Sequence, residues 1–207
     1  MIARPAGRYL GTAALLWALL ILSWAVALPR DWPFLALLAV VGAMIAALAA
    51  FFRDPERTTG PDIVAPADGR VRAVDRDAEV LRISIFMNVT DVHVNRFPLD
   101  ATVDRIDDQG SGYRPAYEED SRHNVRRHYH LTTALGGVEV IQMTGIVARR
   151  LVSYVRPGES HRKGERFGMI GLGSRVDVLL PVDRAAPVVR VGERVRAGET
   201  PIARELP

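Results

Sequence analysis

Two long apolar runs near the start of the chain constrain it more than any other feature. Residues 10–28 and residues 34–52 carry no charged side chain, and each run is close to the length of about 20 residues that crosses a bilayer as a helix. Residues 29–33 lie between them and hold two prolines, which predicts a short turn. We therefore expect a membrane helical hairpin over residues 1–52. A cleaved signal peptide and two buried core helices are the alternatives, and the second run argues against the signal peptide.

The charges around this hairpin predict its orientation. Arg4 and Arg8 precede the apolar runs, and Arg53 and Arg57 follow them. The connecting turn holds one arginine and one aspartate and is neutral. Because positively charged flanks stay in the cytoplasm, both ends and the main domain are expected on the cytoplasmic side of the cell membrane.

The composition excludes several kinds of site. The chain has 207 residues and no cysteine, so it has no disulfide, no thiolate nucleophile and no cysteine metal site. Lys163 is the only lysine, and it would be the only candidate for the Schiff-base lysine of a pyridoxal enzyme. The net charge is +3, carried almost wholly by arginine, which binds carboxylates and phosphates. Anionic partners would explain this preference, and so would a GC-rich genome.

The sequence becomes rich in strand signals after the hairpin. Residues 53–62 are polar with two prolines and are interpreted as a linker. Residues 63–207 contain short β-branched segments that alternate between apolar and polar positions, as half-buried strands do. The predicted fold class is mainly β (α+β), a barrel-sandwich-like β domain preceded by the N-terminal hydrophobic helical hairpin. Strands are expected at 63–65, 70–74, 80–89, 92–97, 101–106, 128–134, 138–145, 176–180, 188–191 and 193–195.

The segments between these strands differ in how clearly they can be interpreted. Gly136 and Gly137 predict a hairpin turn between two of the strands. Residues 110–127 are polar and are expected to form an exposed loop, whereas residues 146–154 fit either a strand or a short helix.

Two of the turns resemble those of lipoyl- and biotinyl-type barrel-sandwich modules. They lie at residues 65–71 and 191–199. Neither has a lysine at its tip to carry such a group, so the likeness indicates a fold and no swinging arm.

The stretch from Gly168 to Asp177 holds the main chemical candidate. It is interpreted as a glycine-rich turn that leads into the strand at residues 176–180, which ends at Pro181. A serine directly after a glycine in such a turn has an accessible hydroxyl and an unhindered carbonyl upstream. These are the local requirements for a self-cleaving bond between Gly173 and Ser174. A plain tight turn is the alternative interpretation.

A histidine and an aspartate join this serine as candidates. His93 lies in an apolar strand, and Asn95 shares its face by the two-residue period of a strand, so that face is polar. Asp68 lies in a Pro-Ala-Asp-Gly turn, where aspartate is also common for turn chemistry alone. Together with Ser174 they complete a Ser-His-Asp set, which is recognised by geometry and not by sequence order.

Two further histidines were considered as metal ligands. His128 and His130 can share one strand face. No third ligand has convincing spacing, so we interpret them as solvated histidines at a loop edge and predict no metal site.

Several motifs in order along the chain resemble the short form of phosphatidylserine decarboxylase. The likeness covers nearly the whole chain and includes the N-terminal apolar pair. Its motifs are Phe51-Phe52-Arg53-Asp54-Pro55-Glu56-Arg57, Ala65-Pro66-Ala67-Asp68-Gly69, Ile85 to Arg96, Ala148-Arg149-Arg150, Gly168-Met169-Ile170 and Gly173-Ser174-Arg175-Val176-Asp177.

The resemblance implies an enzyme that makes its own cofactor. The precursor would cut itself between Gly173 and Ser174, giving a β chain of residues 1–173 and an α chain of residues 174–207. Ser174 would become a covalent pyruvoyl group at the start of the α chain. That group would accept the electrons released when phosphatidylserine loses carbon dioxide and becomes phosphatidylethanolamine.

The resemblance also implies roles for individual residues. Asp68 and His93 would assist the attack by Ser174, and a histidine would act again in decarboxylation. Long forms of the family have two histidines three residues apart at this motif, whereas here Arg96 follows His93 at that spacing. Whether His93 serves cleavage, decarboxylation or both therefore stays open. Arginines that would hold phosphate or carboxylate, or lie on the surface, are Arg96, Arg149, Arg150 and Arg175.

The implied partners are phosphatidylserine, membrane lipid and the two chains of one precursor, with no nucleic acid. A homo-oligomer is left open. Three other functions stay open as well: a decarboxylase of another serine phospholipid such as an archaeal ether lipid (archaetidylserine), a pyruvoyl decarboxylase of a soluble amino acid, and a non-enzymatic membrane-tethered barrel-sandwich adaptor. The membrane hairpin argues against the soluble amino acid, and the adaptor would remain a single uncut chain.

Overall fold

The computed structural model of the chain describes residues 1–3, 6–26, 32–112, 124–145, 151–171 and 174–207. The chain divides into two compact units, Met1–Pro55 and Glu56–Pro207. The first is helical, and the second is built from strands, so the predicted class of a mainly β domain preceded by an apolar helical hairpin is confirmed.

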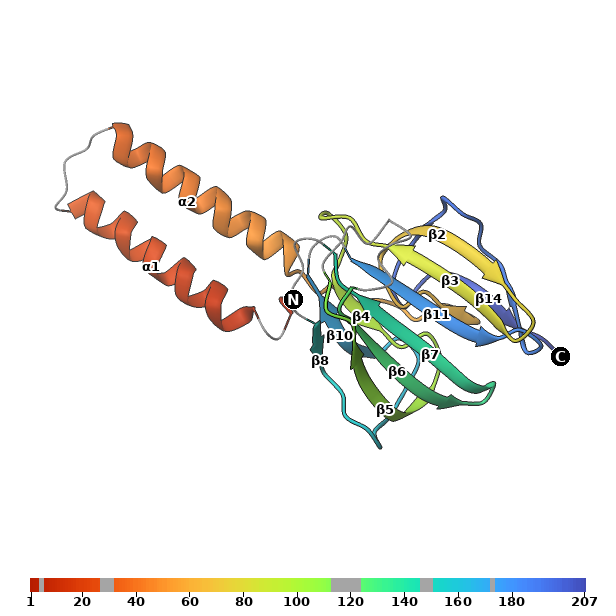
Figure 1. Cartoon of the computed structure of the whole chain (residues 1–207). Coiled ribbons are helices and arrows are strands. Elements are labelled where there is room, and N and C mark those ends of the chain that lie inside the picture. The colour runs from red at the N-terminus through yellow and green to blue at the C-terminus, as the bar shows by residue number, and fades with distance from the viewer. Residues whose placement is uncertain (4–5, 27–31, 113–123, 146–150, 172–173) are drawn as a thin grey trace. The chain divides into compact units, whose positions relative to one another are not determined.

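The first unit is a pair of antiparallel helices (Figure 1). Helix α1 spans Gly7–Val26 and helix α2 spans Trp32–Phe51. Both helices are long and apolar enough to cross a membrane. The chain start returns to the end of α2, where the backbone N–H of Ala3 donates to the Phe52 carbonyl at 2.8 Å.

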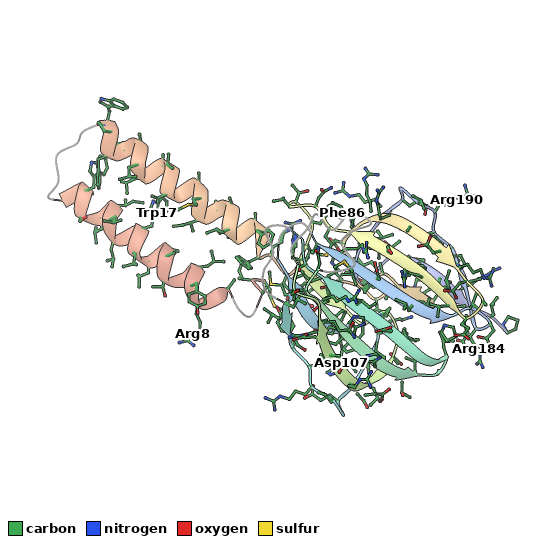
Figure 2. The ribbon with its side chains drawn as sticks, in the orientation of Figure 1. Arg8, Trp17, Phe86, Asp107, Arg184 and Arg190 are labelled. Carbon is green, nitrogen blue, oxygen red and sulfur yellow. The ribbon has the colours of Figure 1, made fainter. Side chains whose placement is uncertain are left out.

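A tryptophan and a glycine allow the two helices to approach each other closely. The indole Nε1 of Trp17 in α1 donates to the Leu38 carbonyl of α2 at 2.9 Å (Figure 2 labels Trp17). A Cβ atom placed on Gly42 would lie 2.6 Å from the Trp17 ring. Only glycine therefore leaves room for this ring between the helices.

The predicted turn between the apolar runs is partly wrong. Residues 29–31 lie outside the described residues, but Trp32 and Pro33 already belong to α2. Proline is tolerated in the first turn of a helix because the N–H that it lacks has no intrahelical partner there. Pro33 therefore lies in the first turn of a helix, where a break was predicted.

The second unit contains three antiparallel sheets within the described residues. Their strand orders are β1-β14-β12, β4-β10-β8 and β13-β2-β3-β11-β7-β6-β5-β9. Figure 1 labels most of these strands. The strands are β1 Ile63–Val64, β2 Gly69–Arg76, β3 Val80–Phe86, β4 Val94–Arg96, β5 Ala101–Gln109, β6 Arg126–Thr133, β7 Gly136–Met143, β8 Leu151–Ser153, β9 Ser160–His161, β10 Arg166–Ile170, β11 Arg175–Pro181, β12 Ala185–Pro187, β13 Arg194–Val195 and β14 Pro201–Glu205.

Alternating apolar residues of the central strands form the core. Strand β3 buries Leu81, Ile83 and Ile85, and its neighbour β11 buries the next apolar row. Because successive side chains point to opposite faces, one row of each strand faces inward. The buried row of β11 and β7 comprises Val176, Val178, Leu180, Val138 and Val140. Some arginines lie on the exterior, such as Arg184 and Arg190 (Figure 2).

Most of the predicted strands are present, and the predicted hairpin is confirmed. The predicted position of its turn at Gly136 and Gly137 is wrong, because Thr133 of β6 pairs with Gly136 of β7 and the turn lies at residues 134–135. Residues 188–191 were predicted as a strand and form none. Strands β9, β12 and β14 were missed, because short irregular segments become strands only when a partner edge lies beside them.

Three segments of uncertain pattern also differ from expectation. Gly168 to Ile170 belongs to strand β10, so the first half of the expected glycine-rich turn is a strand. Of the expected loop at residues 110–127, residues 113–123 lie outside the described residues, while Asn124 is buried and β6 begins at Arg126. Of residues 146–154, Leu151–Ser153 forms β8 and residues 146–150 lie outside the description.

Candidate active site

The register of the largest sheet gathers the candidate residues at one end of it. Phe86, the last residue of β3, lies opposite Arg70 of β2 and Arg175 of β11. Asp68 comes two residues before Arg70, and Ser174 comes one residue before Arg175. The predicted aspartate and serine therefore lie at the same end of the sheet.

Ser174 continues the buried row of β11. Its side chain is fully buried, and its carbonyl accepts a hydrogen bond from the backbone N–H of Met87 at 2.9 Å. Its Oγ donates to the thioether Sδ of Met87 at 3.6 Å. The backbone after the candidate cleavage site is thus anchored to Met87, directly after β3, while Gly173 itself lies outside the described residues.

His93 returns to this end of the sheet through a short turn. The turn is closed by the N–H of Asp91 on the Asn88 carbonyl at 3.0 Å and by the N–H of Asn88 on the Asp91 carboxylate at 2.8 Å. His93 is fully buried beyond it. Met87 and His93 therefore lie on either side of one turn, and Met87 contacts Ser174.

The hydrogen bond of the His93 ring selects its tautomer. Nδ1 lies 2.9 Å from the Asp91 carbonyl oxygen, which can only accept, so Nδ1 carries a proton. In the neutral ring, Nε2 is then the basic nitrogen. The backbone carbonyl of His93 accepts from Ile170 at 3.1 Å. Since consecutive Cα atoms are about 3.8 Å apart, Ile170 lies within about 15 Å of Ser174 along the chain.

Asp68 is held by an arginine and a backbone amide. Arg57 pairs with both carboxylate oxygens, and its Nη2 lies 2.8 Å from Oδ2. The N–H of Ala197 donates to Oδ1 at 2.8 Å. The carbonyl of Pro66, just upstream, accepts from Arg96 of β4 at 2.9 Å, so the Asp68 turn lies beside the strand that follows His93. The contacts described for the Asp68 carboxylate are those with Arg57 and Ala197.

Three buried polar side chains at this site were not predicted as site residues. Asn95 Oδ1 accepts from Gln142 Nε2 at 2.8 Å, and Gln142 Oε1 accepts from the Tyr129 hydroxyl at 3.1 Å. Asn95 Nδ2 in turn lies 3.8 Å from Met87 Sδ. Of these three, Gln142 could have been identified from the sequence, because it is a polar residue at an inward position of an apolar strand. A buried polar side chain needs hydrogen-bond partners, so its position indicates a polar group in the core.

Glycine at position 168 makes room for this group. A Cβ atom there would lie 2.7 Å from the Val152 carbonyl, 2.9 Å from Gln142 Nε2 and 3.2 Å from the Tyr129 hydroxyl. Position 168 in β10 is therefore a glycine because polar atoms from three other strands approach it closely.

The arginines considered for anion binding have different surroundings. Arg96 is buried, and its Nη1 donates to the Gly164 carbonyl at 2.8 Å. Arg175 pairs with Asp177, with 3.0 Å between its Nε and Oδ1. Arg149 and Arg150 lie outside the described residues.

The interpretation of His128 and His130 as loop-edge histidines was wrong. Both lie within β6, and His128 is buried with its Nδ1 on the Glu139 carboxylate. His130 Nε2 lies 3.1 Å from Asp107 Oδ2. The strand begins two residues earlier than predicted, so His128 lies inside it and not at its edge. Among the residues that the structure describes, no group of three or more His, Cys, Asp or Glu has an arrangement suited to a metal ion.

Comparison with known proteins shows which family this chain matches. The family model described as phosphatidylserine decarboxylase matches residues 45–203. A phosphatidylserine decarboxylase proenzyme of Streptomyces avermitilis is 44% identical over 142 residues, covering 67% of this chain and 66% of that protein. A protein of Xanthobacter autotrophicus with the same name is 43% identical over 165 residues, covering 70% and 69%.

A third relative is named for a different substrate. It is a Methanosarcina mazei protein provisionally named an archaetidylserine decarboxylase proenzyme, 42% identical over 188 residues that cover 88% of this chain and 87% of that protein. The chain spans about two thirds of the length of the Streptomyces relatives that it matches, 66% and 65%. No solved structure matches the chain.

Proposed function

This chain belongs to the phosphatidylserine decarboxylase family, and from that premise we propose that it is a precursor that cuts itself between Gly173 and Ser174 and then decarboxylates phosphatidylserine. The observation that carries the proposal is the buried Ser174 hydroxyl at the start of β11, anchored through Met87 beside the turn that leads to His93. The order of the motifs along the chain supports it as well.

The proposed cleavage uses only this chain and water. Ser174 Oγ attacks the carbonyl carbon of Gly173, the peptide C–N bond breaks, and the nitrogen takes the proton, which leaves an ester. Loss of the Ser174 Cα proton then breaks the Cβ–Oγ bond, so Gly173 leaves as a carboxylate and residue 174 becomes a dehydroalanine. Water replaces its nitrogen, which leaves as ammonia, and a pyruvoyl group remains on the chain of residues 174–207.

His93 is the proposed base for this attack. Because Nδ1 is committed to the Asp91 carbonyl, Nε2 is the nitrogen that takes the Ser174 proton and passes it to the departing nitrogen. We assign Asp68 the supporting role of an acidic group at the same end of the sheet, held in place by Arg57. In decarboxylation, His93 would hold a proton near the substrate carbon.

The surroundings of Ser174 fit a small carbonyl group of this kind. The side chain at position 174 is enclosed, with a soft thioether on one side and the Asn95 amide behind it. When formed, the pyruvoyl group supplies an electrophilic carbonyl that takes up the electrons left by departing carbon dioxide. The residues that would hold it are Met87 and His93, with Asn95 behind Met87.

The helical hairpin gives this enzyme its proposed location. Helices α1 and α2 are long and apolar enough to hold the chain in a membrane, where the lipid substrate resides. The flanking arginines favour a cytoplasmic β domain by the positive-inside rule. A serine phospholipid with ether-linked chains is the second candidate substrate, because the Methanosarcina relative is named for it.

Intact mass spectrometry of the purified protein tests the proposal. We expect two polypeptides, residues 1–173 and residues 174–207, the second with a blocked pyruvoyl terminus. The Ser174→Ala variant should be a single uncut chain without activity, and the purified wild type should release carbon dioxide from phosphatidylserine in mixed micelles. An active wild type that is uncut would refute the assignment, and an uncut, inactive and folded wild type would favour the adaptor. Parallel assays with diacyl and diether lipids distinguish the two substrates.

A further inference from the structure

A chain of hydrogen bonds runs from the core of the β domain to the Ser174 hydroxyl. It begins at Tyr129 of β6, passes through Gln142 of β7 and Asn95 of β4, and ends at Met87, which Ser174 also contacts. All five side chains are buried, with exposures between 0% and 1%. The proposed catalytic roles use only the last two groups.

The hydrogen bonds in this series all donate in the same direction, from Tyr129 toward Met87. A carbonyl oxygen only accepts, and the Tyr129 hydroxyl donates to Oε1 of Gln142, so the amide nitrogen of Gln142 faces Asn95 Oδ1. That contact turns the Asn95 amide nitrogen toward Met87 Sδ. Burial raises the pKa of Tyr129, against smaller opposite effects of Ser153 and Arg127, so its hydroxyl keeps the proton that starts the chain.

The thioether at the end is a suitable neighbour for a nucleophilic hydroxyl. Methionine has three rotatable bonds and is a weak acceptor, so by itself it neither keeps one position nor holds a hydroxyl tightly. Contact with the Asn95 amide restricts its movement. A hydroxyl that rests on a weak acceptor at a defined place is oriented and still releases its proton readily to a base.

We propose that Tyr129, Gln142 and Asn95 form a positioning relay that fixes Met87 and thereby orients the Ser174 hydroxyl for its attack on Gly173. The inference rests on the proposed self-cleavage and adds residues from three further strands to it. None of the three touches the reacting atoms in the described geometry, so each acts through its neighbour. The free space that Gly168 leaves beside Gln142 and Tyr129 is what lets the relay pass between the sheets.

The first test removes the start of the relay. Tyr129→Phe keeps the ring that packs edge-on against Phe167 and deletes only the hydroxyl. Full-length precursor is made by cell-free synthesis in detergent micelles, and its conversion to two chains is followed on denaturing gels. We expect cleavage about tenfold slower than in the wild type, the effect of one lost hydrogen bond. Leu180→Ala, a core truncation at the far end of β11, is the control for lost stability and should cleave at the wild-type rate.

The second test reverses the donor at the end of the relay. Asn95→Asp keeps the acceptor for Gln142 and replaces the donor toward Met87 with an oxygen. That oxygen donates only when the carboxyl is protonated. The cleavage rate of this variant relative to the wild type should therefore be low at neutral pH and rise as the pH falls. The rates are compared at temperatures well below the melting temperature of the variant at each pH, because an ionised buried carboxylate also destabilises the fold. For a residue that only supported folding, the ratio would not rise in acid under these conditions.

The outcomes separate this relay from the proposed function. Wild-type rates in both Tyr129→Phe and Asn95→Asp, in a precursor that does cut itself, would overturn the relay alone. The relay would also be overturned if Leu180→Ala had the same melting temperature as Tyr129→Phe and cleaved equally slowly, because lost stability would then explain the effect. A wild-type precursor that never cleaves would overturn the proposed function itself.

Discussion

At the scale of single residues, His93 combines complete burial with one committed ring nitrogen. The Asp91 carbonyl holds Nδ1 at 2.9 Å, so the ring has one tautomer and one basic nitrogen when neutral. Its backbone also holds β10 through Ile170 at 3.1 Å. A change of the ring alone therefore tests its chemistry while this backbone contact remains.

His93→Gln should slow self-cleavage by about 100-fold or more, the usual contribution of a general base. The rate is measured from the gel conversion of the precursor. His161→Gln is a matched control, because that histidine stacks on Phe97 and pairs with Glu165 and has no part in the proposed chemistry. If His93→Gln cuts itself and decarboxylates lipid at wild-type rates, His93 does not belong to the site.

Gly168→Ala should lower stability by about 1–3 kcal/mol, the usual cost of overpacking. The added methyl would meet the Val152 carbonyl at 2.7 Å and Gln142 Nε2 at 2.9 Å. Gly137→Ala in β7 is the control, since a Cβ there meets nothing within 4 Å. Thermal unfolding of both variants measures the difference. Equal melting temperatures would show that the close packing around Gly168 is unimportant.

At the scale of elements, one ion pair joins three segments that are distant in sequence. Arg57 precedes β1, Asp68 lies between β1 and β2, and Ala197 lies between β13 and β14. The side chains of Arg57 and Asp68 are only 7% and 11% exposed, so the pair is largely desolvated. Breaking one side of a buried pair leaves the other charge without compensation.

Arg57→Ala should therefore destabilise the β domain by about 3 kcal/mol, as measured by urea unfolding. Arg105→Ala serves as the comparison, because Arg105 and Asp107 are 65% and 34% exposed and such pairs contribute less than about 1 kcal/mol. A loss for Arg57→Ala no larger than that of Arg105→Ala would contradict the structural role given to this pair.

At the scale of the whole molecule, the proposed anchoring by the helical hairpin can be distinguished from binding to lipid through surface charges. Charges on the surface of the β domain could also attract anionic lipid, but salt screens that attraction within about 10 Å at 0.1 M. Burial of apolar helices is not weakened in this way. Resistance to salt therefore distinguishes the two kinds of binding.

Full-length protein should stay with lipid vesicles after a wash in 1 M salt, as measured by sedimentation. Val41→Arg places a charge in the middle of α2, where it costs about 3 kcal/mol on insertion, and should weaken retention. Release of the wild-type protein by salt alone would show that the hairpin does not anchor it.

Periodicity and local chemistry made much of this protein predictable. The apolar runs are long enough to show a helical hairpin by length alone, and the alternation in β3 shows an inward face without any knowledge of its partners. Several motifs in order along the chain, including the one around Ser174, indicated the family, which the comparisons confirm. The roles of Ser174, His93 and Asp68 remain predictions that the experiments above address.

Local sequence by itself determined which segments are apolar helices, which faces of the strands turn inward and where a glycine precedes a serine, because each of these depends on neighbouring residues. Only the tertiary structure decided that Tyr129, Gln142 and Asn95 meet beside Met87. A two-residue period assigns a side chain to a face of its strand but does not say which strand lies next to it. That choice depends on pairing between residues far apart in the chain, which no local pattern encodes.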